Sequence, residues 1–321
     1  MSNLYRKQLT LTIPEDFSFW RTVLSHGWCV LAPFSLDRER RVLARTLKIR
    51  QQPVCIEIRA RGPDRLEILA RSHRPLLKAD SQEILSQVAG MLRLNESLHD
   101  FYQSLDCADS RDLNWIPKAK AGRLLRGPSL FEDIVKMICT TNCSWSATER
   151  MVQNLVQKLG MRFDEGHACF PTPEELAATS VDFLVKEVRT GYRSAYLIEL
   201  ATRVSTGKLN LNGCLSSETT ELYEQLLEIK GVGPYAAGNI LRLLGHYDFL
   251  ALDSWCRQRF AELHRAGRRV SDRAIARRYK RYGRWQGLVM WLELTRKWFD
   301  EEETHTEGAR PVDPAQFDMR T

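Results

Sequence analysis

The stretch that decides the fold is LLEIKGVGPYAAGNI, residues 226–240. Two glycines, Gly231 and Gly233, flank one valine, and Pro234 follows directly. Proline suits the first turn of a helix because its missing N–H would have no partner there. Glycine permits a tight turn with no Cβ in the way of an approaching group. The stretch therefore predicts two helices joined by a short hairpin, over residues 219–245.

Such a hairpin can bind a phosphate. Its backbone amides lie beside the positive end of the second helix, where anions are favoured. Lys230 adds a positive charge at the rim. A helix–hairpin–helix of this kind holds a DNA backbone without reading base sequence. We assign Lys230, Gly231 and Gly233 to DNA-backbone binding; the alternative is a turn that only joins two packed helices.

The pattern upstream of the hairpin is typical of strands. Residues 1–78 contain the alternating runs KQLTLTI, VLARTLKI, PVCIEIRA and RLEILARS. The third run would place four side chains on one face of a sheet: Val54, Ile56, Ile58 and Ala60. From residue 79 to 300 the apolar residues recur at helical spacing. The sequence therefore predicts an α+β protein, with an N-terminal antiparallel β-sheet domain followed by an all-α body.

We expect this helical body to have two lobes with the site between them. Residues 131–252 would form the lobe that contains the hairpin. The second lobe would combine residues 79–130 with residues 253–300. Residues 301–321 are polar and contain prolines, so we expect a flexible tail there.

Composition limits the class of protein. The chain has 321 residues, 43% hydrophobic and 27% charged, with a net charge of +7 and a pI near 9.0. A basic protein suits a polyanionic partner. Eight cysteines without a CxxC pair indicate reduced thiols. The sequence shows no signal peptide and no long uncharged apolar run. We expect a cytoplasmic protein without membrane association, nucleoid-associated if bacterial, and monomeric.

A family resemblance rests on the residues after the hairpin. In YDFLALDSWCRQRF, Asp253 follows an apolar segment and precedes a helix, which is an N-cap position. Gly233–Pro234 followed by Asp253 resembles the signature of the helix–hairpin–helix glycosylase superfamily of base-excision repair. The similarity also covers FWRTVLSHGWCVLAPF, GRLLRGPSLFEDIVKMICTTN and RYGRWQGLVMWLEL, in the order of the alkylpurine and 8-oxoguanine glycosylases.

The resemblance implies an enzyme that acts on double-stranded DNA. Breaking an N-glycosidic bond builds oxocarbenium character on the deoxyribose, so a nearby carboxylate stabilises the transition state. The family assigns this role to Asp253; capping a helix is the alternative. The target base would first leave the stack and enter a pocket with aromatic walls.

Tyr235 stands where bifunctional members of the family carry a nucleophilic lysine. A phenol cannot form a Schiff base, so the resemblance here is to monofunctional alkylpurine glycosylases. An aromatic wall also attracts a cationic alkylated purine, by roughly 0.5–2 kcal/mol. Asn239, one helical turn later, would face the same pocket. Ordinary core packing is the alternative for Tyr235.

The resemblance marks five further positions. Asn142 aligns with an asparagine that fills the space left by the flipped base, although it can also terminate a helix. Gly27 and Trp28 lie near a pocket glycine of the 8-oxoguanine glycosylases, or form a strand-end turn. Met290 replaces a glutamine that reads the oxidised base in those enzymes. Trp291 can be a pocket wall or a core residue.

No cofactor is expected. Only Cys256 lies beyond residue 214, so the four-cysteine iron–sulfur loop of other family members is absent, and histidines and cysteines do not occur at zinc spacings. Whether a monovalent cation binds at the hairpin stays an open question. The arginine-rich run over residues 257–284 is either a solvated helix face or a phosphate-binding surface.

The sequence thus predicts a monofunctional DNA glycosylase that releases damaged, alkylated purines. The alternatives are a glycosylase for oxidised (8-oxoguanine) or deaminated bases, and a non-catalytic DNA-binding protein.

Overall fold

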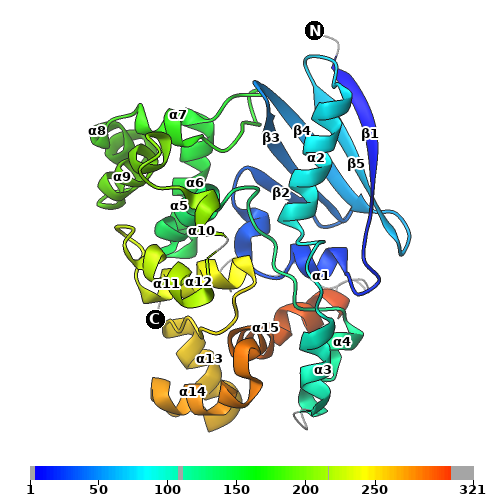
Figure 1. Ribbon diagram of the computed structural model, residues 1–321, viewed down its shortest axis with the longest axis vertical. Helices are drawn as coiled ribbons and strands as arrows, with labels where there is room; N and C mark the ends of the chain where they lie inside the picture. Colours follow the sequence, from blue (N-terminus) through cyan, green and yellow to red (C-terminus); the bar gives the residue numbers. More distant parts are fainter. Residues whose placement is uncertain (1–3, 108–110, 216, 305–321) are drawn as a thin grey trace.

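The computed structural model describes residues 4–107, 111–215 and 217–304. Its N-terminal part is one antiparallel sheet in the order β1-β5-β4-β3-β2 (Figure 1). The strands are β1 Tyr5–Thr12, β2 Phe34–Asp37, β3 Val42–Ile49, β4 Gln52–Ala60 and β5 Arg65–Ser72. Four of them confirm the strand-like runs of the sequence. The sequence did not indicate β2, because four residues are too few to show an alternation.

One face of the sheet is buried, as predicted from β4. Val54, Ile56 and Ile58 have no exposed surface, whereas Ala60, at the end of the strand, is exposed, contrary to the prediction. The helix α2, Lys78–Met91, crosses the sheet and packs on β1 and β3 (Figure 1). This helix therefore shares the core of the sheet, not that of the second lobe, because its apolar side is covered there.

The helical body divides into two groups of helices. The hairpin lobe contains α5 Leu130–Thr140, α6 Trp145–Leu159, α7 Pro173–Ala177, α8 Val181–Phe183, η3 Leu184–Val188, α9 Arg193–Ser205, α10 Leu211–Cys214, α11 Thr219–Leu227 and α12 Pro234–Leu244. The second lobe contains α3 His99–Cys107, η2 Arg111–Leu113, α4 Trp115–Lys118, α13 Ser254–Arg265, α14 Asp272–Tyr279, η4 Lys280–Trp285 and α15 Gln286–Thr304.

The second lobe joins segments that lie far apart in the sequence. Its core combines buried residues between Leu98 and Ala121 with others between Tyr247 and Leu294. Figure 1 shows α3 and α4 beside α15, although more than 160 residues separate α15 from each of them. The helix α15 continues to Thr304, past the predicted start of the tail at residue 301. Residues 305–321 lie outside the described part of the chain.

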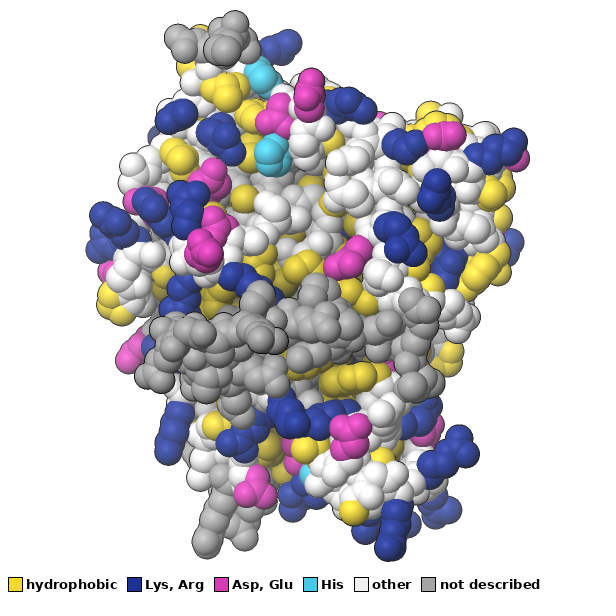
Figure 2. Space-filling view, turned by 180° about the vertical axis from the view of Figure 1, so that it is seen from behind, with side chains coloured by type: hydrophobic (Ala, Val, Ile, Leu, Met, Phe, Trp, Pro, Cys, Tyr) yellow, Lys and Arg dark blue, Asp and Glu magenta, His cyan; other side chains and the backbone are white. Residues whose placement is uncertain are grey.

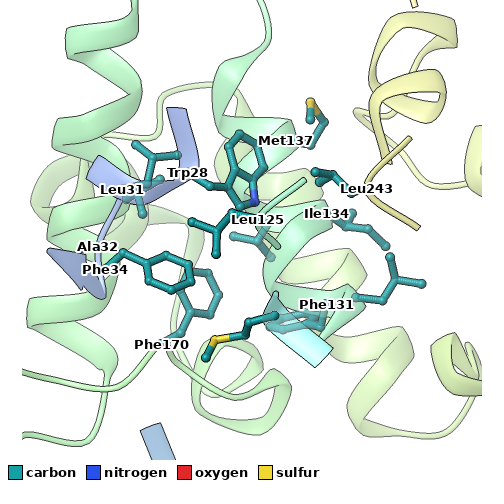
Figure 3. Close-up of a cluster of buried hydrophobic side chains, with 14 of the residues drawn as sticks. Trp28, Leu31, Ala32, Phe34, Leu125, Phe131, Ile134, Met137, Phe170 and Leu243 are labelled. Atoms are coloured by element: carbon teal, nitrogen blue, oxygen red, sulfur yellow. The ribbon is translucent and has the colours of Figure 1, made fainter. Parts of the chain in front are cut away.

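The sheet and the hairpin lobe share one hydrophobic core. Every residue of α5 is buried, so this helix lies in the middle of the molecule. Figure 3 shows where it meets its neighbours: Trp28, from η1 Gly27–Val30, lies near Met137 of α5 and Leu243 of α12. This contact places one edge of the sheet domain against the hairpin lobe. Among the described residues, no helix is long and apolar enough to span a membrane.

Candidate active site

The hairpin has the predicted geometry. The helix α11 ends at Leu227, before the two glycines, and α12 begins at Pro234. Gly231 has φ of +88°, and a Cβ at this position would lie 2.8 Å from the ring of Tyr196. Gly233 caps α12, and a Cβ there would meet open space. Gly231 is therefore required by the turn itself, whereas Gly233 leaves room for an approaching group.

A groove runs between this hairpin and the turn that joins α5 to α6. We call it the hairpin groove; its walls include Asn142, Tyr192, Tyr196, Gly231 and Gly233. Asn142 is exposed at the tip of the turn, with a left-handed φ of +49°. The predicted insertion residue thus faces the groove from the side opposite the hairpin. Its role in a duplex stays a prediction.

Buried Arg193 holds this turn in place. Its guanidinium donates a hydrogen bond to the backbone oxygen of Thr141, directly before Asn142. The guanidinium also lies over the ring of Tyr192, 4.5 Å from the centroid. The same arginine therefore orders both the turn and an aromatic side chain of the groove.

Lys230, predicted to contact a phosphate at the rim of the hairpin, forms an ion pair in this structure. Its Nζ pairs with Glu199 Oε2 at 2.7 Å on the surface of the molecule. The lining of the hairpin groove, which includes Gly231 and Gly233, does not include this lysine. The geometry therefore favours the backbone amides of the turn, rather than Lys230, for contact with a phosphate.

Behind the groove lies a cavity whose wall contains residues of the sheet domain and of both helical lobes. We call it the aromatic cavity, because five tryptophans and one tyrosine line it: Trp28, Trp145, Tyr235, Trp255, Trp291 and Trp298. Gly27, Asn239 and Asp253 also line it. The structure therefore brings together six of the residues proposed for the pocket or for catalysis: Gly27, Trp28, Tyr235, Asn239, Asp253 and Trp291.

Met290 is the exception. Its side chain has no exposed surface and packs in the core of the second lobe. The lining of the aromatic cavity contains its neighbour Trp291 instead. Adjacent residues of a helix point about 100° apart, and here Trp291 faces the cavity while Met290 faces the core. Met290 is thus a core residue in this structure.

Close packing fixes two of the cavity walls. A Cβ on Gly27 would lie 2.4 Å from the indole ring of Trp145, so this ring can pack here only against glycine. The indole Nε1 of Trp28 donates to Asp133 Oδ1 at 2.9 Å. Asp133 is fully buried, and this burial raises the pKa of its carboxyl group. A buried hydrogen bond from a tryptophan to a carboxyl group leaves the ring little freedom.

Asp253 lies where the cavity opens into the hairpin groove. It caps α13, and its Oδ1 accepts a hydrogen bond from the backbone N–H of Cys256 at 2.6 Å. Asp253 and Tyr235 line both spaces. Burial, together with the charge and a hydrogen bond of Asp253, raises the pKa of the Tyr235 hydroxyl well above its ordinary value. The phenol stays protonated and donates to the carboxylate, which faces any group passing from groove to cavity.

A buried guanidinium lies at the polar side of the cavity. Arg242 donates to Asn239 Oδ1 at 3.1 Å and to the Leu250 backbone oxygen at 2.8 Å. It lies over the Trp291 ring, 4.9 Å from the centroid. Asn239 in turn donates to the backbone oxygen of Tyr235 at 2.9 Å. These bonds orient the side chains that line the cavity without involving a bound group.

His26 completes the wall in its neutral form. Burial lowers its pKa to about 4. Its Nε2 lies 2.6 Å from the backbone oxygen of Leu125, and its Nδ1 lies 3.4 Å from the backbone nitrogen of Trp28. A neutral ring that donates from Nε2 and accepts at Nδ1 satisfies both contacts. The ring thus adds no charge to the cavity near neutral pH.

Sequence reasoning missed several of these residues. Trp145, Trp255 and Trp298 belong to the wall but were not assigned to it. One signal was present in the sequence: Trp291 and Trp298 are seven residues apart, so they share a helix face. Tyr192 and Tyr196, four residues apart, carried the same signal for the groove.

Within the described residues, no group of three or more histidine, cysteine or acidic side chains could hold a metal ion. The expectation that the protein needs no cofactor stays a prediction, as does the open question of a cation at the hairpin.

Comparison with known proteins finds a family model that matches part of this chain. Residues 135–288 match the family model described as HhH-GPD superfamily base excision DNA repair protein. The chain is 28% identical over 157 residues to the N-glycosylase/DNA lyase of Saccharomyces cerevisiae, a match that covers 42% of this chain and 41% of the yeast protein. It is thus similar to less than half of that relative. It is also 23% identical over 245 residues to a putative DNA-3-methyladenine glycosylase, YfjP, of Bacillus subtilis, covering 74% and 79% of the two chains.

A solved structure shares the fold over nearly the whole chain. The structure of MBOgg1 in complex with a low affinity DNA ligand superposes with a TM-score of 0.70 at 22% identity. The superposition covers 93% of this chain and 99% of that one. The arrangement of a sheet domain followed by a helical body is therefore shared with this structure.

Proposed function

We propose that this protein is a DNA glycosylase that releases a damaged purine by hydrolysis. Its residues 135–288 match the HhH-GPD superfamily of base excision DNA repair proteins. One observation carries the proposal. Asp253 and Tyr235 line both the hairpin groove and the aromatic cavity, so they stand at the passage between the two. A nucleotide whose backbone lay in the groove and whose base lay in the cavity would have its sugar at this passage.

The chemistry follows from the charge of Asp253. Leaving of the base puts positive charge on the deoxyribose, and a carboxylate held nearby stabilises that charge. Asp253 is held by the Cys256 amide and by the hydroxyl of Tyr235. It also caps the N-terminus of α13, the positive end of that helix dipole. Because these contacts exist before any substrate binds, little reorganisation is needed in the transition state.

The aromatic wall supports an alkylated purine as the substrate. Alkylation at a ring nitrogen makes the base cationic and electron-poor, and such a base is attracted to aromatic faces. Five tryptophans and Tyr235 line the cavity, and the carboxylate of Asp253 lies where it meets the hairpin groove. His26 is neutral, so it does not repel a cationic base from its side of the cavity.

A second substrate class is favoured by Arg242. Its guanidinium also lines the cavity and is almost completely buried. Burial lowers the pKa of this group, but arginine side chains stay protonated in proteins. A buried cation disfavours a cationic base and favours a neutral base with a carbonyl oxygen. Oxidised and deaminated purines carry such an oxygen. Arg242 thus favours a neutral base, whereas the aromatic wall favours a cationic one.

Release of the base without strand cleavage is the last part of the proposal. The linings of the cavity and of the groove contain no lysine among the described residues. Lys230 pairs with Glu199 outside the groove. The phenol of Tyr235 cannot form a Schiff base, so the expected product is an intact strand with an abasic site.

A panel of duplexes that each carry one defined lesion tests the proposal. The panel contains 3-methyladenine, 7-methylguanine, hypoxanthine and 8-oxoguanine, and excision is followed under single-turnover conditions with alkali added to reveal abasic sites. Fast release of the methylated bases alone supports the alkylpurine assignment. Fast release of hypoxanthine or 8-oxoguanine alone would show that Arg242, not the aromatic wall, sets the substrate. If no base is released, the remaining hypothesis is a non-catalytic DNA-binding protein.

A further inference from the structure

The positive charge of the chain is concentrated in one segment that the cavity and the hairpin do not use. Residues 257–284 contain ten arginines and one lysine but two acidic residues, so their net charge is +9. The whole chain carries +7, which leaves a net charge of −2 for the other 293 residues. The segment comprises most of α13, with α14 and η4, at the lower end of the molecule in Figure 1. Figure 2 shows basic side chains gathered over this end.

Part of this segment forms a second groove, which we call the arginine groove. It lies between α13 and α14, and its walls are Phe260, His264, Arg265, Ala274, Arg277, Arg278 and Arg281. The last four are spaced i, i+3, i+4 and i+7, so they occupy one side of α14 and its continuation into η4. Ile275, Tyr279 and Tyr282 are buried on the other side. The burial of these three residues holds the arginines toward the groove.

Internal ion pairs neutralise only some of the arginines. Three pairs with N···O distances of 2.7 to 3.0 Å use up acidic groups of the region: Arg257–Asp272, Arg259–Glu262 and Arg278–Glu293. Burial would raise the pKa of Glu293, but hydrogen bonds from Arg278 and Tyr279 outweigh it and lower that pKa, so the carboxylate stays ionised.

Three charges of the arginine groove are left over. Arg265, Arg277 and Arg281 are exposed, and none of them pairs with an acidic group of the described chain. Desolvation lowers the pKa of His264, so this ring is neutral at pH 7. The groove therefore presents three unneutralised guanidinium groups beside one neutral ion pair.

One helix connects this groove to the candidate active site. The N-cap of α13 is Asp253, and its last residue is Arg265. Twelve helical residues span about 18 Å at 1.5 Å each. Successive phosphates of one strand lie about 3.4 Å apart along the axis of a duplex, so this length corresponds to about five base pairs.

We propose that the arginine groove binds the phosphodiester backbone of duplex DNA about five base pairs from the flipped nucleotide. Guanidinium groups bind phosphate oxygens in a bidentate way, and several weak contacts along a backbone need no enclosed site. An open groove with three separate charges suits such a polyanion better than it suits a single small anion. The inference rests on the proposed function for its position relative to the flipped base.

The test compares a triple variant with a matched control. The variant carries Arg265→Ala, Arg277→Ala and Arg281→Ala. The control carries Arg6→Ala, Arg61→Ala and Arg74→Ala, three exposed arginines at or beside the strands of the sheet, so both proteins lose three charges. Affinity for an undamaged 25-base-pair duplex is measured between 50 and 200 mM salt. We expect the variant to bind ten- to a hundredfold more weakly than the wild type near 150 mM salt, with a slope of log K against log salt reduced by about 3. The control should bind like the wild type.

Position is tested with an abasic-site analogue placed three base pairs from one end or from the other end of the duplex. In one orientation the DNA does not reach the arginine groove, so the triple variant and the wild type should bind equally well. In the other orientation the loss should reappear. Equal losses in both orientations, or equal losses in variant and control, would overturn the proposal.

These readouts also separate the two proposals of function. Binding to undamaged DNA does not require excision, so a wild type that releases no base can still show the loss in the triple variant. If the wild type excises bases but the triple variant binds DNA with the same salt dependence as the wild type, only the proposal on the arginine groove is refuted.

Discussion

Replacing Asp253 by asparagine separates its two roles in this structure. As the N-cap of α13, the side chain accepts a hydrogen bond from the Cys256 amide at 2.6 Å. An asparagine oxygen can accept the same bond, and asparagine is among the best N-cap residues. The substitution therefore removes the charge and keeps the cap. Asp253→Ala removes both.

The size of the effect follows from the electrostatics of the site. A carboxylate about 4 Å from a developing positive charge contributes about 4 kcal/mol at an effective dielectric constant of 20. Loss of the charge should then slow excision by about a hundredfold to a thousandfold. The cap contributes about 1 kcal/mol to folding, so Asp253→Ala should also lower the melting temperature by about 2 °C, and Asp253→Asn should not.

The assay is single-turnover excision on the best substrate of the lesion panel, beside duplex binding and thermal unfolding. Asp272→Asn is the matched control, because Asp272 also begins a helix of the second lobe but pairs with Arg257 on the surface. Near-normal excision by Asp253→Asn would remove the proposed mechanism. An equal loss of excision in Asp272→Asn would show that the effect is not specific to the cavity.

Three further outcomes are expected. Borohydride should trap no covalent adduct on a lesion duplex, because Tyr235 supplies no amine; a strong adduct that disappears in Lys230→Ala would refute the assignment as a glycosylase without strand cleavage. Gly231→Ala should lower the free energy of unfolding by about 1 kcal/mol or more, since φ is +88° there. Gly233→Ala should fold normally and weaken binding to every duplex alike. A loss of binding confined to one base sequence would contradict the role of the turn. His26 should reduce stability in acid, because its ring gains a proton below pH 6.5 in the unfolded chain but only near pH 4 in the folded protein. The free energy of unfolding should therefore fall by about 2 kcal/mol between pH 8 and pH 5. If His26→Gln has the same pH profile of unfolding as the wild type, this prediction is wrong.

The elements of the fold could be predicted because their signals are local. Alternation over seven or eight residues identified four strands, and the two glycines with Pro234 located the hairpin to the residue. The position of Asp253 as an N-cap could be predicted from the sequence, whereas its catalytic role came from the family resemblance and stays a prediction. The strand β2 was missed because four residues carry too little periodicity.

The tertiary structure alone decided which side chains meet. The cavity wall combines Trp28 from the sheet domain, Trp145 from α6 and Trp291 from α15, residues that no local pattern connects. Helical spacing marks an apolar face but not its partner, so Met290 and Trp291 were equivalent in the sequence, and packing put one in the core and the other at the cavity. An ion pair between the hairpin turn and α9 turned Lys230 toward Glu199 for the same reason. Periodicity and turn chemistry act between neighbours along the chain, whereas a binding site is made by contacts between residues far apart in it, and these are fixed only when the elements pack.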